Sequence, residues 1–169
     1  MHIKLHLRML LDEFDLATTQ LEIVEKEVSE VLKNITFSDK ILGIKGLTEI
    51  TLGGILGETG DLSKFAHGNS LLRHAGLHLV EASSGKWKGQ IVLSKRGRSR
   101  LRRYLFLATL SLVANNPEFK ALHSYNVKVK KMKKMKSIMK LIGKLARILV
   151  GVARRNESYC PDVQKKCIH

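Results

Sequence analysis

Aromatic residues are scarce in this 169-residue sequence. They make up 5% of the chain, with one Trp and three Tyr, whereas hydrophobic residues make up 44%. Leu, Ile, Val and Met must therefore supply most of the packing, a composition that favours helices. The length allows one ordinary domain with an extended arm, or two small domains.

Long apolar runs are also missing. No stretch approaches the roughly 18 apolar residues that a membrane-spanning helix requires. Asp12 and Glu13 lie too close to the N-terminus for the first residues to form a signal peptide. We therefore expect a cytoplasmic protein without a membrane partner.

Residues and motifs typical of common catalytic sites are few. The 2 cysteines, Cys160 and Cys167, have no second pair with which to form a zinc site. There is no phosphate-binding Walker loop, no G-x-G-x-x-G and no H-E-x-x-H. His74 and His78 lie four residues apart without a neighbouring carboxylate, and the acidic residues of the glycine-rich region form no metal-binding cluster. The sequence predicts no metal site.

Acidic residues are almost absent from one long segment. Residues 86–155 contain 20 Lys and Arg but a single Asp or Glu, whereas residues 1–85 contain 8 basic and 12 acidic residues. A short charged run is usually a solvated face. A segment of this length repels itself unless a polyanion neutralises it, and counterion release makes binding to phosphates favourable. The charge distribution predicts a nucleic-acid-binding protein.

The N-terminal segment carries a heptad repeat. Its apolar residues recur in alternating steps of four and three, at Ile3, Leu7, Leu10, Phe14, Ala17, Leu21, Val24, Val28, Val31 and Ile35. A helix of that length measures about 50 Å. We expect a coiled-coil arm that forms a homo-oligomer through residues 3–35; the alternative is a long helix that packs on its own domain.

A glycine-rich turn follows at residues 43–46. Gly43 and Gly46 separate a short helix that ends at Leu42 from an apolar helix over residues 47–57. This arrangement resembles a helix-hairpin-helix, in which turn amides and the next helix N-terminus face phosphates. A plain turn between two helices is the alternative. Asp61 or Ser63 is expected to cap a short helix, and Asn69 or Ser70 another that Gly76 ends.

The apolar residues of the next region no longer recur at the helical spacing. Residues 77–93 fit two short strands or a loop. Leu101, Leu105, Ala108 and Leu112 then form the buried stripe of a helix, with Arg96, Arg100 and Arg103 opposite. A last helix places its apolar residues opposite Lys140, Lys144 and Arg147, which is also typical of helices that bind anionic membranes or calmodulin-like grooves. The second basic region, residues 86–103, favours nucleic acid.

Ser84 is a candidate nucleophile. It precedes Gly85 and is flanked in sequence by Lys86, Lys88, Lys95 and Arg96, cations that would stabilise charge on a phosphodiester under attack. The same Ser-Ser-Gly sequence is common in ordinary turns, and the sequence places no base beside it.

From Ile41 onward, an ordered series of motifs resembles a known family. The motifs are GIKGLTEITLGGILGETGDLSKF, LLRHAGL, EASSGKWKG, LSKRGRSRLRRYLFLATL, NNPEF and KLARIL. In this order and spacing they resemble the C-terminal transposase domain of the insertion-sequence-110 family, the DEDD-type, bridge-RNA-guided transposases and recombinases. The preceding heptad helix is similar to the helical connector of such proteins.

The resemblance implies DNA transposition and recombination. It implies a serine nucleophile at Ser84, or alternatively Ser83, that links covalently to DNA, while a separate DEDD domain binds Mg²⁺. These 169 residues do not contain that domain, so we expect the chain alone to be inactive and to hold no cofactor. The implied partners are DNA and a guide (bridge) RNA, in the nucleoid of a bacterium or archaeon.

The sequence therefore predicts a mainly α-helical protein: a coiled-coil arm (1–36), a transposase core with the helix-hairpin-helix-like turn and the Ser-Gly loop (37–116), basic amphipathic helices (117–155) and a tail (156–169). A non-enzymatic coiled-coil nucleic-acid-binding protein derived from a transposon is the alternative function. The residues expected to bind nucleic acid are Gly43, Lys45, Gly46, Lys86, Lys88, Lys95, Arg96, Arg98, Arg100, Arg102, Arg103, Lys140, Lys144 and Arg147.

Overall fold

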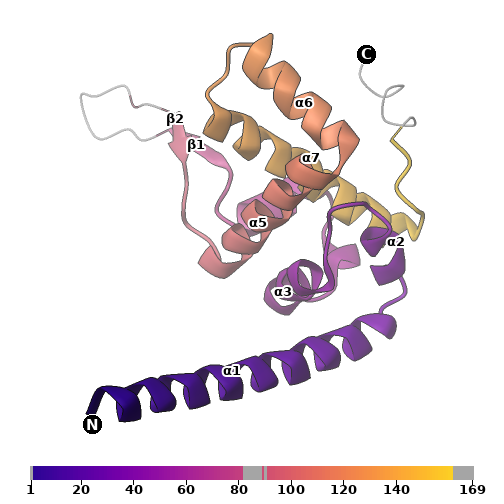
Figure 1. Cartoon of the computed structure of the whole chain (residues 1–169). Coiled ribbons are helices and arrows are strands. Elements are labelled where there is room, and N and C mark those ends of the chain that lie inside the picture. The colour runs from indigo at the N-terminus through magenta and orange to yellow at the C-terminus, as the bar shows by residue number, and fades with distance from the viewer. Residues whose placement is uncertain (1, 82–88, 90, 162–169) are drawn as a thin grey trace. The chain divides into compact units, whose positions relative to one another are not determined.

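The computed structural model describes residues 2–81, 89 and 91–161. It divides into two units, Met1–Ile35 and Thr36–His169. The first unit is the long helix α1 (His2–Lys33), and the second is a helical domain with a small sheet (Figure 1). The predicted fold class, mainly helical with a long N-terminal helix, is confirmed. The elements of the second unit are α2 (Ser38–Leu42), α3 (Glu49–Thr59), the 3-10 helix η1 (Leu62–Lys64), α4 (Gly68–His74), β1 (Leu79–Glu81), β2 (Ile91–Leu93), α5 (Ser99–Asn115), α6 (Pro117–Lys128) and α7 (Lys134–Arg155).

Helix α1 forms where the heptad repeat predicted it, but ends at Lys33, before the last seam position at Ile35. The amides of Asn34 and Ile35 bond to carbonyls three residues back, which closes the helix in a tight turn. The large seam side chains of the helix that are exposed are Ile3, Leu7, Leu10, Phe14, Leu21, Val24 and Val31. An exposed apolar row is typical of a helix that pairs with another. Pairing stays a prediction.

Helix α7 is the central helix of the second unit. It packs against α2, η1, α4, α5 and α6. The apolar stripe expected from the sequence is buried, together with small and β-branched residues beside it: Ile138, Leu141, Ile142, Leu145, Ala146, Ile148, Leu149, Val150, Val152 and Ala153. Because this face is the core of the domain, it is not available to a membrane or to a peptide-binding groove. Among the described residues, no helix is long and apolar enough to cross a membrane.

Helix α5 packs against α3, α6 and α7. Its predicted stripe of Leu101, Leu105, Ala108 and Leu112 is fully buried, as expected from the helical period. Asn116 ends α5 and caps α6: its side-chain oxygen accepts hydrogen bonds from the amides of Glu118 and Phe119. Pro117 occupies the first turn of α6, where no amide donor is needed.

Residues 77–93, whose sequence shows no helical period, contain a small antiparallel sheet. Strand β1 pairs with β2, with Leu79 opposite Leu93 and Glu81 opposite Ile91. Three-residue strands of this kind are marginal without further packing. Of the two alternatives predicted for residues 77–93, two short strands or a loop, the structure has the two strands.

Helix α4 begins earlier than its sequence suggests. We expected Asn69 or Ser70 to cap it, and this was wrong: His67 is the capping residue, and its Nδ1 accepts a hydrogen bond from the amide of Ser70 at 3.2 Å. Histidine is not among the usual capping side chains, so sequence preference pointed to the neighbouring polar residues. Asp61 caps η1 as expected, and its hydrogen bonds from Ser63 lower the pKa of its carboxyl group.

Candidate nucleic-acid interface

Basic residues gather around the start of α5. Arg100 and Arg103 are exposed, and so is Arg96, which lies just before the helix. The first turn contains no acidic residue, and Arg98 at the cap position makes no capping bond with its side chain. Cations are unfavourable at the positive end of a helix, by a few tenths of a kcal/mol each. A phosphate bound there would relieve this repulsion and accept hydrogen bonds from the free amides.

Two of the expected phosphate-binding arginines have partners inside the protein. The Arg102 guanidinium is half-buried and donates to the carbonyl of Ala75 at 2.9 Å. Arg98 donates to the carbonyl of Glu58 at 2.6 Å and lies 3.8 Å from its carboxylate. Both side chains therefore join α5 to other elements. Arg96 also differs from expectation, because it precedes α5 and does not lie on its exposed stripe.

Hydrogen bonds to the end of α4 fix the segment that carries Arg96. The amides of Lys95 and Arg98 donate to the carbonyls of Gly76 and His74, at 2.9 and 3.0 Å. Lys95 adopts a left-handed conformation with φ of 53°, which is unusual for a residue other than glycine. These contacts place Arg96 beside α4, a proximity that the sequence did not indicate.

Several backbone groups of the glycine-rich turn already form hydrogen bonds within the protein. The amides of Gly43 and Leu47 bond to preceding carbonyls, and Asn116 Nδ2 donates to the carbonyl of Lys45 at 3.2 Å. Gly46 has φ of 103°, and a side chain there would lie 3.1 Å from the carbonyl oxygen of Ser111 in α5. Gly46 therefore serves a tight turn and a close approach to α5. The Gly43 backbone and the Lys45 side chain are exposed, and their contact with phosphate stays a prediction.

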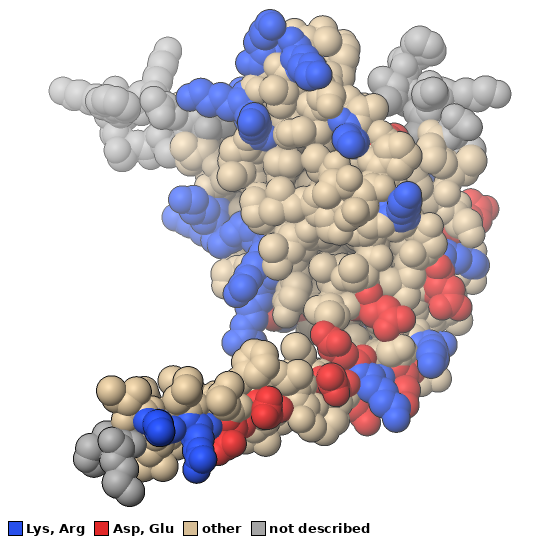
Figure 2. Space-filling view, in the orientation of Figure 1, with Lys and Arg blue, Asp and Glu red and all other residues tan. Residues whose placement is uncertain are grey.

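The three basic residues of α7 that were expected to bind nucleic acid differ in their exposure to solvent. Lys140 and Arg147 are exposed, whereas Lys144 Nζ lies 2.7 Å from Glu118 Oε1 in α6. That ion pair is largely shielded from solvent, so it makes Lys144 a contact between α6 and α7. Figure 2 shows Lys and Arg side chains down the left-hand edge of the helical domain.

Two hollows with basic walls lie on either side of α4. The first, of about 450 Å³, is lined by His67 and Gly68 at the start of α4 and by Arg147, Arg154 and Arg155 of α7. The second, of about 430 Å³, is lined by Arg73, Arg96 and neighbouring residues of α4. Sequence reasoning missed Arg73, Arg154 and Arg155. Arg154 and Arg155 reach the first hollow through the packing of α4 against α7, and Arg73 lines the second through the contact of α4 with the segment before α5. Both contacts are long-range, and the sequence carries no signal for them.

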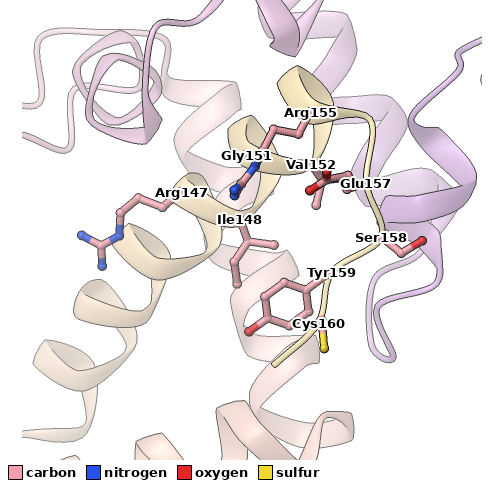
Figure 3. A pocket seen from close by; sticks show the side chains of 9 residues that line it. All are labelled: Arg147, Ile148, Gly151, Val152, Arg155, Glu157, Ser158, Tyr159 and Cys160. Carbon is pink, nitrogen blue, oxygen red and sulfur yellow. The ribbon is translucent and has the colours of Figure 1, made fainter. Parts of the chain in front are cut away.

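A smaller hollow of about 100 Å³ lies where the chain leaves α7. Figure 3 shows residues 157–160 running alongside the helix, with the Tyr159 ring beside Ile148 and the Arg155 head group over Gly151. Tyr159 donates a hydrogen bond to Glu118 Oε2 at 2.7 Å. The segment after α7 is thus attached to α6 through Glu118.

The candidate nucleophile lies outside the described residues, as do Ser83, Lys86 and Lys88. Lys95 and Arg96 follow β2 beyond the Leu79–Leu93 end of the sheet. The described part of the chain contains no group of three or more His, Cys, Asp or Glu residues that could hold a metal ion.

Comparison with known proteins identifies the family. Residues 38–124, more than half of the chain, match the Transposase IS116/IS110/IS902 family. No curated protein matches the sequence. The match covers the glycine-rich turn, α3, α4, the small sheet, α5 and most of α6, and it therefore includes Arg73, Arg96, Arg100 and Arg103 but not the arginines of α7. The resemblance found in the sequence motifs is confirmed: the chain belongs to the Transposase IS116/IS110/IS902 family, and its role is related to DNA transposition.

Proposed function

We propose that this chain is the DNA-binding, serine-bearing domain of a transposase and acts in DNA transposition and recombination. Family membership over residues 38–124 is the observation that carries the proposal. The exposed Arg96, Arg100 and Arg103 around the start of α5 support it, because they face solvent and none of them forms an ion pair with another residue that the structure describes. These arginines hold DNA phosphates, and in doing so position the duplex without reading its sequence.

The proposed chemistry is attack of a serine hydroxyl on a DNA phosphodiester. Ser84 Oγ, or alternatively Ser83 Oγ, forms a bond to phosphorus, and the bond from phosphorus to one deoxyribose oxygen breaks. The hydroxyl proton passes to a base, and the departing oxygen takes up a proton. The product is a serine–DNA phosphodiester, which preserves the bond energy for rejoining. A separate DEDD domain would hold Mg²⁺, and the bound ion would stabilise the negative charge that develops on the phosphate.

Self-association through α1 is part of the proposal. Recombination joins two DNA partners, and a paired α1 would hold two copies of the basic domain together. The exposed seam of Leu7, Leu10, Phe14 and Leu21 supports this arrangement. A guide RNA is a second proposed partner, since the basic surface suits either kind of phosphate backbone.

Reconstitution with a DEDD domain tests the function. Full-length chain, the Ser84→Ala variant and the Ser83→Ala variant would each be combined with that domain, Mg²⁺ and a DNA substrate, and serine–DNA adducts detected on denaturing gels. We expect the Ser84→Ala variant to lose the adduct while its DNA affinity stays unchanged. Adducts that persist in the double Ser83→Ala, Ser84→Ala variant would contradict the catalytic part. DNA binding and self-association without any adduct in the unsubstituted chain would favour the non-enzymatic alternative.

A further inference from the structure

The two hollows beside α4 share a chemical character. Their lining residues include five arginines and not one carboxylate. The ion pairs found among the described residues, Arg98 with Glu58 and Lys144 with Glu118, involve none of these five. Like charges gathered in this way repel one another until an anion neutralises them. The charge balance therefore indicates an anionic ligand from outside the chain.

The donors in the first hollow suit a phosphate in particular. Because His67 Nδ1 accepts the hydrogen bond from Ser70, the neutral imidazole carries its proton on Nε2, which is then a donor. Arg154 donates one hydrogen bond to the carbonyl of Ala66, and a guanidinium has five N–H groups in all. One guanidinium group can donate two parallel hydrogen bonds to two oxygens of the same phosphate. The side chains of the hollow thus offer donors to an acceptor-only ligand.

The position of the first hollow depends on close packing between α4 and α7. A Cβ added to Gly68 would lie 2.6 Å from both the Cα and the backbone nitrogen of Arg147. No side chain larger than hydrogen fits at that point, and the absence of one brings the arginines of α7 against the start of α4. The basic hollow is therefore built into the core packing of the domain and does not depend on surface side chains alone.

The length of α4 suits a polymer of phosphates. Helix α4 has 7 residues and joins the hollows, since His67 and Gly68 line the first and Ser70, Arg73 and His74 line the second. Seven helical residues span about 10 Å. A DNA strand advances about 3.4 Å along the axis for each nucleotide, so phosphates about three nucleotides apart reach both ends of α4.

We propose that α4 and its two hollows form a second DNA-backbone site, which we name the α4 surface: His67, Arg73, Arg96, Arg147, Arg154 and Arg155. The proposal rests on the proposed function. It extends the DNA-binding surface from the start of α5 to the C-terminal end of α7. One strand of duplex DNA lies along α4, with phosphates in both hollows. Arg73 and Arg155 are positioning residues for DNA, one in each hollow.

Salt-dependent binding of the full 169-residue chain tests this site. The Arg73→Gln, Arg155→Gln variant removes one exposed cation from each hollow, and the Lys120→Gln, Lys128→Gln variant removes two exposed cations from α6 as a charge-matched control. Each phosphate contact contributes about 0.9 to the slope of log affinity against log salt for duplex DNA. We expect the arginine variant to lower the slope by about 1.8 and the affinity about tenfold, with little change in the control.

The outcomes separate this inference from the proposed function. Absence of any salt-dependent DNA binding by the unsubstituted chain would contradict the proposed function. Normal DNA binding with an unchanged slope in the arginine variant would overturn the α4 surface alone. A loss confined to structured RNA, or complete competition by inorganic phosphate at matched ionic strength, would overturn its assignment to DNA.

A second variant covers the case in which the glutamine substitutions disturb folding. Arg73→Lys, Arg155→Lys keeps both charges but loses the planar, two-pronged geometry of the guanidinium. We expect it to keep the slope and to bind DNA several-fold more weakly. Affinity equal to that of the unsubstituted chain would exclude guanidinium recognition at the α4 surface. Helix content, measured by circular dichroism, would establish that each variant is folded.

Discussion

Gly68 contacts the backbone of Arg147 so closely that any added Cβ would lie 2.6 Å from it. This approach is part of the packing of α4 on α7, and the first basic hollow is lined by residues from both sides of the contact. The two nearest atoms belong to the main chain of α7, and they cannot move aside as the end of a flexible side chain could. The relationship has a measurable consequence.

We expect Gly68→Ala to destabilise the domain by about 1–3 kcal/mol, because overpacking forces the two helices apart. Gly57→Ala is the matched control: it lies inside α3 with nothing within 4 Å of an added Cβ. Replacing a helical glycine there is expected to stabilise the chain by about 0.5–1 kcal/mol. Urea unfolding measures both. Equal stability of the Gly68→Ala variant and the unsubstituted chain would show that α4 is not tightly packed on α7.

Asn116 makes two kinds of contact that substitutions can separate. Its Oδ1 caps α6 through Glu118 and Phe119, and its Nδ2 donates to the carbonyl of Lys45. Asn116→Ser keeps a capping oxygen but is too short to reach Lys45, so we expect it to cost about 1 kcal/mol. Asn116→Ala loses the cap as well and is expected to cost about 1 kcal/mol more. Thermal unfolding would compare them; equal melting temperatures for the two variants would mean that the cap contributes nothing.

Tyr159 attaches the segment after α7 to Glu118. Partial burial, and the hydrogen bond to Glu118, raise the pKa of Tyr159 above its usual value of 10.0. A raised pKa in the folded state means that the contact is fully present below pH 10 and weakens as pH rises toward the folded-state value. We expect residues 157–160 to detach in that alkaline range, and Tyr159→Phe to remove about 0.5–1.5 kcal/mol at neutral pH.

Ultraviolet difference titration of the unsubstituted chain against the Tyr159→Phe variant isolates this tyrosine. The difference should report a phenol that ionises above pH 10, and amide hydrogen exchange of residues 157–160 should accelerate over the same range. A phenol that titrates at its usual value would contradict the attachment to Glu118.

Self-association through α1 allows a closely matched comparison. Leu21, on the seam, is 57% exposed, and Leu16, off the seam, is 59% exposed. Either residue changed to Glu alters the single helix by a similar amount, but only Leu21→Glu puts a charge into the proposed helix pair. We expect Leu21→Glu to weaken association at least about tenfold, or about 1.4 kcal/mol, and Leu16→Glu to change it little.

Light scattering across a concentration series measures this association. A monomeric unsubstituted chain would contradict the proposed coiled coil. Equal weakening by both substitutions would place the interface on more of the α1 surface than the heptad seam.

Periodic features were predictable from the sequence because each depends on residues close together along the chain. The heptad repeat predicted α1, and the spacing of Leu101, Leu105, Ala108 and Leu112 predicted the buried face of α5. The loss of helical period between residues 77 and 93 coincided with the small sheet. Ordered motifs indicated the family. The concentration of basic residues after residue 85 indicated a phosphate-binding surface, which stays a prediction.

Only the tertiary structure decided which of the basic residues are available to a ligand. Arg98, Arg102 and Lys144 have the same charge as their neighbours in the sequence, yet each is bonded to a residue at least 26 positions away. Conversely, Arg155 lines a hollow beside the start of α4, where the absence of a side chain at position 68 lets α4 contact Arg147 of α7. Arg73 shares a hollow with Arg96 because the end of α4 is hydrogen-bonded to the segment before α5. Net charge follows from composition, but the pairing of each charge depends on long-range packing, which no local pattern encodes.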